Sequence, residues 1–387
     1  MYKAFKYRIF PTEPQKELIA KHIGSSRFVF NLALETKNAA YISAKHNYSA
    51  FDLVKQLPEL KKECPWLKEV NSQSLQQAIQ NMDIAFKKFF KGAGFPKFKK
   101  KSNRGSFPIP QNVMVEDDLL IIPKFKEGIK MSLHRPTKGI IKSATISFTP
   151  TGKYFVSILC DTKEELPTKA PIKESTTIGI DLGIKSFAIT SEGEVFENPK
   201  YLRKAQSKLK YVQRKYSKYK GKRTKKKLAK LHENVVNKRK DFLHKVSTQL
   251  IRENQTIAIE TLAVKNMVRN HNLAQAISDV SWSTFVSMLE YKADWYGKNV
   301  LRIGQFAPSS KTCSCGVINK DLKLSDRVWS CKSCGTTHDR DILAACNIKS
   351  FALKNYLSGE HRLKNRNELP TLVGVMTSEA PSPLGKG

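Results

Sequence analysis

Two close pairs of cysteines stand near the C-terminal end of the sequence, in the stretch KTCSCG…WSCKSCGTTHDRD. Two residues separate Cys331 from Cys334, as in a zinc knuckle, whereas only one separates Cys313 from Cys315. Four sulfurs spaced in this way are typical of a zinc ribbon, in which thiolates hold one ion tetrahedrally. We expect one structural zinc ion, although the short pair leaves open a weakened site whose hairpin survives by packing around Trp329.

Three acidic residues stand where the pattern predicts the ends of secondary-structure elements. Asp181 lies in the apolar strand of GIDLG, Glu260 ends the apolar strand of IAIETL, and Asp341 opens the helix of RDILAACNIKSF. A lone buried acid is costly unless its charge is used. Three such acids can converge on two magnesium ions, which activate water and stabilise the leaving oxygen in phosphodiester cleavage. The alternative is three unrelated acids, with Asp181 at a strand end, Glu260 in a salt bridge and Asp341 as a helix cap.

The elements that position these acids alternate between strand and helix periodicity. The expected order is a strand carrying Asp181, a hairpin, two long helices interrupted at Gly221, the strand of Glu260, a helix over residues 274–297, the strand VLRIG and a final helix. This order fits an α/β fold of the ribonuclease-H type.

The two long helices form a basic hairpin over residues 200–245. Between Lys200 and Lys245 the chain has nineteen Lys and Arg but only two acids, Glu233 and Asp241. A solvated helical face normally mixes both signs, so we expect this hairpin to contact nucleic acid. The residues we assign to that contact, with one lysine beside the first cysteine pair, are Lys204, Lys208, Arg214, Lys215, Lys222, Arg223, Lys225, Lys226 and Lys311.

The first half of the sequence predicts a different fold class, α+β. Residues 1–10 alternate as a half-buried strand does, and Thr12 can cap a helix that Gly24 can end. Further helical patterns run to residue 104, and short alternating runs over residues 105–165 indicate a small antiparallel sheet, barrel-like and shared with the first strand. We therefore expect a multidomain chain. Its expected parts are a β-rich domain (1–10 and 105–170), a helical module (11–104), a nuclease domain (176–308 and 336–355), a zinc insert (309–335) and a mobile tail (356–387).

Composition restricts the partners. Sixty-eight Lys and Arg against thirty-four Asp and Glu give a formal charge of +34, which favours a polyanion partner, and nucleic acid above all. No run of about 18 apolar residues is present, so we expect no membrane partner. The start lacks a secretory signal and the seven cysteines are odd in number, so we expect a reducing cytoplasm. Cys64, Cys160 and Cys346 have no partner at useful spacing and are expected to be small packed residues.

Taken together, these motifs resemble the TnpB family, the RNA-guided nucleases of bacterial and archaeal insertion sequences and relatives of the type V CRISPR effectors. The resemblance rests on the order of YRIFPTEPQKELI, GFPKFKKK, GIDLGIKSFAIT, IAIETL, APSSKTCSCG and CKSCGTTHDRDILAACNI. It implies a RuvC-type nuclease domain with a zinc-binding insert, a preceding wedge domain and a helical recognition lobe. It also implies catalytic roles for Asp181, Glu260 and Asp341 with two magnesium ions, Asp339 being the nearby alternative.

The resemblance further implies a guide RNA made from the transposon end, a short target-adjacent motif, and cleavage of DNA paired with the guide. Base pairing would then select the sequence, while the protein holds an A-form duplex by its backbone. The expected partners are that RNA and double- or single-stranded target DNA, in the cytoplasm of a prokaryote.

Two departures from the family pattern lie beside these motifs. They are the shortened CSCG and Leu343, where the family usually has Asn. Both leave the three acids intact but could weaken activity. Two alternatives therefore stay open: an RNA-guided DNA-binding protein without cleavage, and a DNA transposase acting on transposon ends.

Overall fold

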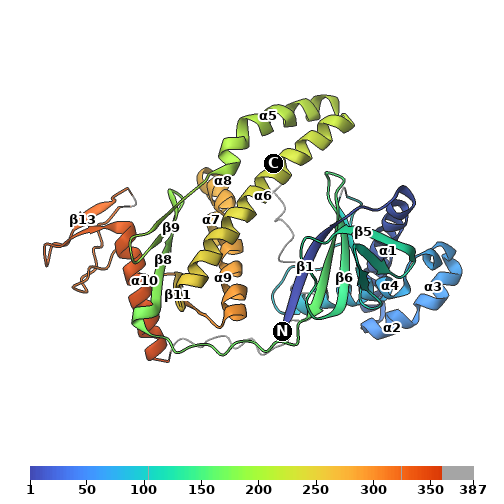
Figure 1. Ribbon diagram of the computed structural model, residues 1–387, viewed down its shortest axis with the longest axis horizontal. Helices are drawn as coiled ribbons and strands as arrows, with labels where there is room; N and C mark the ends of the chain where they lie inside the picture. Colours follow the sequence, from blue (N-terminus) through green and yellow to red (C-terminus); the bar gives the residue numbers. More distant parts are fainter. Residues whose placement is uncertain (103, 324, 360–387) are drawn as a thin grey trace. The chain divides into compact units, whose positions relative to one another are not determined.

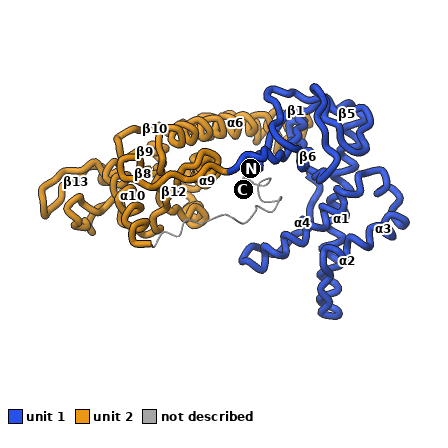
Figure 2. The backbone as a smooth tube through the Cα atoms, turned by 60° about the horizontal axis from the view of Figure 1, so that its bottom comes forward, with its two compact units in different colours: residues 1–165 blue, residues 166–387 orange. Residues whose placement is uncertain are grey.

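The computed structural model describes residues 1–102, 104–323 and 325–359. The chain folds into two compact units, residues 1–165 and the residues from 166 onward (Figures 1 and 2).

The first unit is built on a seven-stranded antiparallel sheet that the N-terminal strand enters near its middle. The strand order is β2-β6-β7-β1-β5-β4-β3. Strand β1 pairs with β7 from Tyr2 opposite Asp161 to Ile9 opposite Tyr154, and with β5 on its other side. This confirms the expected sharing of the first strand. The strands are β1 (Tyr2–Ile9), β2 (Gly105–Ile109), β3 (Met114–Glu116), β4 (Leu119–Ile122), β5 (Phe125–Ser132), β6 (Ile140–Phe148) and β7 (Tyr154–Asp161).

Helices accompany this sheet, and the first of them corrects a prediction. Thr12 is the N-cap of α1, as expected, but the helix does not end at Gly24 and continues to Ala44. Val29, Phe30 and Leu34 are buried beyond the glycine, and that packing outweighs the roughly 1 kcal/mol that a helical glycine costs. The helices of this unit are α1 (Glu13–Ala44), α2 (Ala50–Lys55), α3 (Leu57–Glu63), the 3-10 helix η1 (Pro65–Glu69) and α4 (Ser72–Phe90).

The second unit contains a five-stranded mixed sheet of order β10-β9-β8-β11-β12. Strands β8, β11 and β12 are parallel, and β9 and β10 are antiparallel to their neighbours. Ile257 and Ile259 pack in one cluster with residues of α6 (Lys222–Glu253) and α9 (Trp282–Tyr296). Ala258, between them, packs instead with Ile348 of α10 (Arg340–Leu357). Helices therefore cover both faces of the sheet. Its strands are β8 (Thr177–Leu182), β9 (Ser186–Thr190), β10 (Val195–Glu197), β11 (Thr256–Glu260) and β12 (Asn299–Ile303).

The helices of the second unit follow the predicted order with two changes. The expected helix over 274–297 is broken at Ser281, whose φ of 59° is left-handed. The final helix runs to Leu357, so the predicted tail begins later than residue 356, and residues 360–387 of it lie outside the described residues. The elements are η2 (Glu174–Thr176), α5 (Tyr201–Tyr219), α6 (Lys222–Glu253), α7 (Val264–Met267), α8 (His271–Val280), α9 (Trp282–Tyr296), the hairpin β13 (Val328–Ser330) and β14 (Thr337–Asp339), and α10 (Arg340–Leu357).

Among the described residues, no helix combines the length and the apolar character that crossing a bilayer needs.

Candidate active site and metal centre

Asp181 and Glu260 lie at the carboxyl ends of two neighbouring parallel strands: Glu260 is the last residue of β11, and Asp181 is the last but one of β8. The pairing of β8 with β11 ends at Ile180 and Ile259, and a residue with a carboxylate follows each of them. The residues of both strands that precede these acids are buried. The sequence pattern therefore brings two acids to the carboxyl edge of the sheet, where α/β folds place their ligand sites.

Asp341 lies in the first turn of α10, and Asp339 is the cap of that helix. The Asp339 carboxylate accepts hydrogen bonds from the backbone N–H groups of Asp341, at 2.9 Å, and Ile342, at 3.0 Å. The alternative in which Asp341 serves as the helix cap is therefore wrong. Capping occupies Asp339 and leaves the Asp341 carboxylate for other partners.

The three acids affect one another electrostatically. Burial raises the pKa of Asp181 to about 6, and the negative charge of Asp341 adds to the rise, while Arg340 and Arg327 oppose it. Burial also raises the pKa of Glu260 to about 7, with a further contribution from Asp181. Among the described residues no cation forms an ion pair with Glu260, so the salt-bridge alternative is not supported. Carboxyl groups that disfavour their own charge in this way are typical of sites that hold a cation.

Arg327 contacts this group directly. Its Nη1 atom lies 3.1 Å from each oxygen of the Asp341 carboxylate. Within the described ranges, only the four cysteines have candidate ligand atoms that all lie within 4.8 Å of one another, so the three carboxylates are more widely spaced. Arg327 therefore occupies both oxygens that a cation at Asp341 would need.

The sequence reasoning missed Arg327, although a signal was available. Hairpin pairing across the second cysteine pair puts Val328 opposite Asp339. Residue 327 must then lie beside the start of α10, and its backbone C=O accepts from the Arg340 N–H at 2.8 Å. The pairing of residues around a C-x-x-C turn would have predicted this neighbour.

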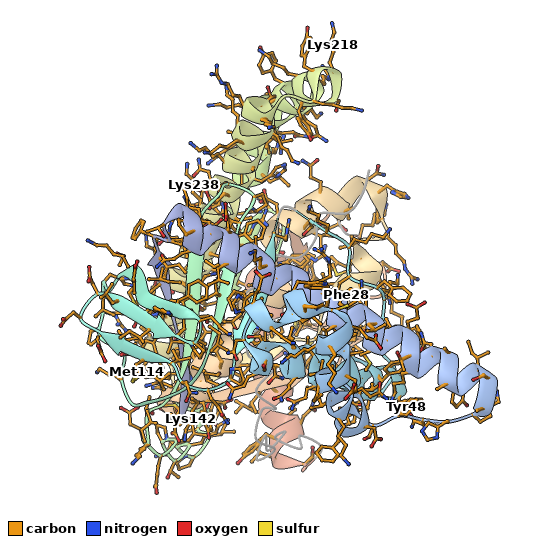
Figure 3. All side chains as sticks on the ribbon, turned by 90° about the vertical axis from the view of Figure 1, so that its right-hand side faces the viewer. Phe28, Tyr48, Met114, Lys142, Lys218 and Lys238 are labelled. Carbon is orange, nitrogen blue, oxygen red and sulfur yellow. The ribbon has the colours of Figure 1, made fainter. Side chains whose placement is uncertain are left out.

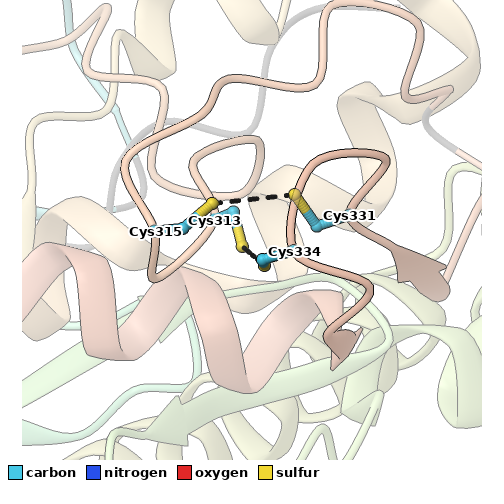
Figure 4. A group of neighbouring side chains, drawn as sticks. All are labelled: Cys313, Cys315, Cys331 and Cys334. Atoms are coloured by element: carbon cyan, nitrogen blue, oxygen red, sulfur yellow. Dashed lines mark hydrogen bonds between the residues drawn. The ribbon is translucent and has the colours of Figure 1, made fainter.

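The four cysteines form one cluster, as the spacing predicts (Figure 4). Sγ of Cys313 lies 3.5 Å from Sγ of Cys334, and Sγ of Cys315 lies 3.7 Å from Sγ of Cys331. A disulfide needs about 2.05 Å, whereas sulfurs on one tetrahedral zinc ion with bonds of about 2.3 Å stand roughly 3.8 Å apart. The cluster therefore fits a zinc site.

Hydrogen bonds in the second knuckle favour the thiolate form of its two cysteines. Backbone amides of Cys334 and Ser333 lower the pKa of Cys331, and contacts with Thr336 lower the pKa of Cys334 to about 6. In addition, Nε2 of His338 lies 3.0 Å from Sγ of Cys313. Thiolates are the form that binds metal, so these contacts favour binding.

The shortened first knuckle retains part of the usual cradle. The chain turns at Gly316, whose φ is +89°, and the Gly316 N–H donates to the Cys313 C=O at 2.9 Å. A backbone hydrogen bond from Val317 lowers the pKa of Cys315, but hydrogen bonds with the other three cysteines outweigh it and raise that pKa to about 12. Leu343, the second departure from the family pattern, is buried with Trp329 and Cys313. Its apolar side chain thus belongs to the packing that supports the cysteine cluster.

The basic hairpin is the third candidate site. The eight residues assigned to nucleic-acid contact on α5 and α6 are all exposed, whereas Lys311 is half-buried beside Cys313. Figure 3 shows Lys218 near the far end of the hairpin, with side chains extending outward around it. Leu209 and Val212 of α5 are buried, as is Val235 of α6, so the hairpin has its own apolar seam.

One buried carboxylate anchors the base of this hairpin. Asp279 of α8 accepts from the Leu202 N–H in the first turn of α5, at 3.0 and 3.2 Å, and from Nη2 of Arg239 of α6, at 2.8 Å. Lys200, the N-cap of α5, supplies no capping side chain. An acid from another helix therefore satisfies this helix N-terminus.

Three family models match the chain. Residues 157–271 match a model described as "Probable transposase", residues 282–348 match the Cas12f1-like TNB domain, and residues 1–46 match a model described as a helix-turn-helix domain. The TNB match contains the cysteine cluster. In the structure, residues 1–46 hold strand β1 and the single long helix α1.

Full-length relatives also match. The chain is 38% identical to a protein of Streptomyces pristinaespiralis named "Putative RNA-guided DNA endonuclease", over 92% of this chain and 91% of that protein. It is 32% identical to "Putative RNA-guided DNA endonuclease InsQ" of Escherichia coli K12, over 89% of this chain and 91% of that protein. A solved structure titled as a Cas12f1–sgRNA–target DNA complex shares the fold, with a TM-score of 0.54 and 12% identity over 90% of this chain and 98% of that one. The chain therefore belongs to the TnpB family, the family of the OrfB_IS605 domain.

Proposed function

We propose that this protein is an RNA-guided DNA endonuclease that binds a guide RNA derived from a transposon end and cleaves DNA complementary to it. The observation that carries the proposal is the placement of Asp181 and Glu260 at the carboxyl edge of the sheet, where the charge of Asp341, at the start of α10, contributes to the raised pKa of Asp181 and the charge of Asp181 to that of Glu260. The names of the relatives and the shared Cas12f1 fold support the same function.

The chemistry we propose belongs to a RuvC-type site. Two magnesium ions bound there would activate a water and stabilise the leaving oxygen of the phosphodiester. Asp181, Glu260 and Asp341 would supply oxygen ligands, the type that magnesium prefers. Arg327 is placed to neutralise Asp341 before the ions bind, and Asp339 holds the first turn of α10 in position.

The other parts of the chain receive proposed roles in nucleic-acid binding. Residues 1–10 and 105–170 would form the wedge domain and residues 11–104 the recognition lobe, which together read a short target-adjacent motif. The exposed cations of α5 and α6 would contact the phosphates of the RNA or of its duplex with DNA. Such contacts fix the position of the duplex without reading its sequence.

The test is reconstitution with RNA copurified from the native locus, followed by incubation with matched and mismatched DNA in the presence of Mg²⁺. Cleavage of the matched DNA alone is expected. A transposase, the function suggested by the description of the family model over residues 157–271, would act on transposon ends without RNA. A protein that binds matched DNA in an RNA-dependent way but leaves it uncut would instead be a binding protein.

A further inference from the structure

A second basic surface lies in the first unit, and the function proposed above does not yet use it. Residues 86–101, which we name the aromatic–basic segment, hold five Phe and seven Lys but no Asp or Glu. They comprise the last turn of α4 and the irregular chain that follows. Phe90 is 78% exposed, Phe95 49% and Phe98 52%. Exposed apolar surface that is concentrated in this way often marks a binding site, whereas single exposed apolar residues are normal.

The end of α4 fixes how the segment leaves the helix. The Gly92 N–H donates to the Phe89 C=O at 2.9 Å and the Ala93 N–H to the Lys88 C=O at 3.0 Å, which is a Schellman cap. Gly92 has a φ of +89°, as the left-handed position of that cap requires. The chain therefore reverses sharply just after the last lysine of the helix.

Packing and hydrogen bonds then hold the segment in place. The ring of Phe95 forms T-shaped contacts with the rings of Phe86 and Phe89, with centroids 5.6 and 5.3 Å apart. Further on, the Lys99 N–H donates to the Asn31 side chain at 2.7 Å, and the same Asn31 amide donates to the Lys99 C=O at 3.0 Å. Nζ of Lys99 also lies 3.8 Å above the ring of Phe30 on α1. The segment is thus a preformed surface, which lowers the entropic cost of binding.

Rings and cations in this alternation match one chemistry. Unpaired bases stack on aromatic side chains whatever their sequence, and adjacent lysines neutralise the phosphates between those bases. Duplex nucleic acid keeps its bases stacked on each other and offers no free face for Phe90 or Phe98. An acidic protein would satisfy the lysines but would leave these rings without a specific partner.

We propose that the aromatic–basic segment binds unpaired nucleotides of the guide RNA, with bases stacked on Phe90 and Phe98. This inference rests on the proposed function, because it takes the guide RNA as the partner. RNA is preferred to DNA because sequence-specific recognition of RNA relies mainly on splayed, unpaired bases.

The first experiment locates the contact. An RNA with the sequence of the copurified RNA is synthesised with 5-iodouridine and bound to the full chain. The complex is irradiated and digested, and the crosslinked peptides are identified by mass spectrometry. Crosslinks within residues 89–99 are expected. If the crosslinks fall only elsewhere, the inference is overturned even when the complex cleaves DNA. If the crosslinks appear here and no DNA is cleaved, the proposed function fails and this inference survives.

The second experiment tests stacking against charge, with a labelled oligouridylate and an oligodeoxythymidylate of equal length. The double variant Phe90→Leu/Phe98→Leu should bind oligouridylate roughly 5- to 100-fold more weakly at every salt concentration, with an unchanged salt slope. Lys88→Gln should instead reduce the slope by about 1. Phe98→Tyr keeps a stacking ring and should retain binding. Phe51→Leu removes a ring of similar exposure (66%) from α2 and should change nothing.

Two results would overturn the inference. One is equal binding of oligouridylate by the double Leu variant and the wild type. The other is a loss confined to oligodeoxythymidylate, which would assign the surface to DNA.

Discussion

Arg327 holds the Asp341 carboxylate by both oxygens, at 3.1 Å each. The arginine stands at the start of the β13–β14 hairpin, which also carries the second cysteine pair, and Asp341 stands two residues after that hairpin ends. The cysteine cluster and Asp341, one of the three acids, therefore belong to one continuous stretch of chain. The β13–β14 hairpin thus positions an arginine against one of the three acids to which we assign magnesium binding.

Removal of zinc should therefore affect cleavage. We expect Cys334→Ser to lose zinc, to unfold the hairpin locally and to lower cleavage at least 10-fold, because Arg327 and the start of α10 lose their support. Zinc content by mass spectrometry and cleavage rate with guide RNA measure the two effects. Cys64→Ser, the same change at a cysteine outside the cluster, is the control and should retain zinc and activity. Full activity in a zinc-free Cys334→Ser protein would contradict this coupling.

Each of the three acids should be required for cleavage but not for RNA binding. Asp181→Ala, Glu260→Ala and Asp341→Ala are each expected to reduce cleavage to background, because each removes an oxygen ligand of the proposed ions. Binding of the guide RNA, followed by gel shift, should remain within about 2-fold.

Two control variants sharpen this assignment. Glu197→Ala removes an exposed acid from β10 of the same sheet and should leave cleavage unchanged. Asp339→Asn keeps a good helix cap and should retain activity, whereas Asp341→Asn should not. The reverse order of these last two variants would transfer the catalytic role to Asp339.

The pH dependence of stability should report the two buried acids. The folded pKa values of Asp181, about 6, and Glu260, about 7, lie above the unfolded values near 4. The stability that these groups contribute is therefore full below pH 4 and is lost as pH rises through 6 and 7. Without metal, the free energy of unfolding of the wild type should fall relative to that of Asp181→Asn/Glu260→Gln between pH 5 and 8. The slope is at most about 1.4 kcal/mol per pH unit for each acid.

Magnesium should reverse this trend, because it binds the deprotonated carboxylates. The stabilisation of the wild type by Mg²⁺ should thus grow from pH 5 to 8, and the double variant should show none of it. Comparison with that variant also cancels the contribution of His22 to the pH dependence of stability. Burial lowers the pKa of His22, so that contribution has the opposite sign. A difference between the two proteins that does not change with pH would refute the assignment of these pKa values.

The close contact between β8 and α10 leads to a prediction about stability. A Cβ atom at Gly179 would lie 2.0 Å from the backbone oxygen of Ala345. Gly179→Ala should therefore push α10 away from the sheet and destabilise the second unit by about 1–3 kcal/mol, measured by denaturant unfolding. Gly304→Ala, just after β12, meets no atom within 4 Å and should be neutral or slightly stabilising. Equal stability of the two variants would show that the helix can adjust at no cost.

The sequence pattern predicted the elements that carry the acids, because an acid at the end of an apolar strand is costly unless its charge is used. It misplaced boundaries wherever tertiary packing overrides local propensity, as at Gly24 inside α1. It could not predict the break at Ser281, because a left-handed serine leaves no mark in apolar periodicity. The distinction between Asp339 and Asp341 likewise depends on two backbone hydrogen bonds that only the folded helix start defines.

The anchor of the basic hairpin gives the last prediction. Asp279 accepts from Leu202 of α5 and Arg239 of α6, and it is only 9% exposed, so its loss leaves a half-buried arginine and a helix N-terminus without an acceptor. Asp279→Ala should speed hydrogen exchange at the first turn of α5 and weaken guide-RNA binding several-fold, because the hairpin is no longer held at one angle. Asp241→Ala removes an exposed acid from α6 that pairs with Lys245 one turn away, and it should change neither measurement. Faster exchange at α5 with unchanged RNA binding would show that this anchor stabilises the hairpin without orienting it for RNA.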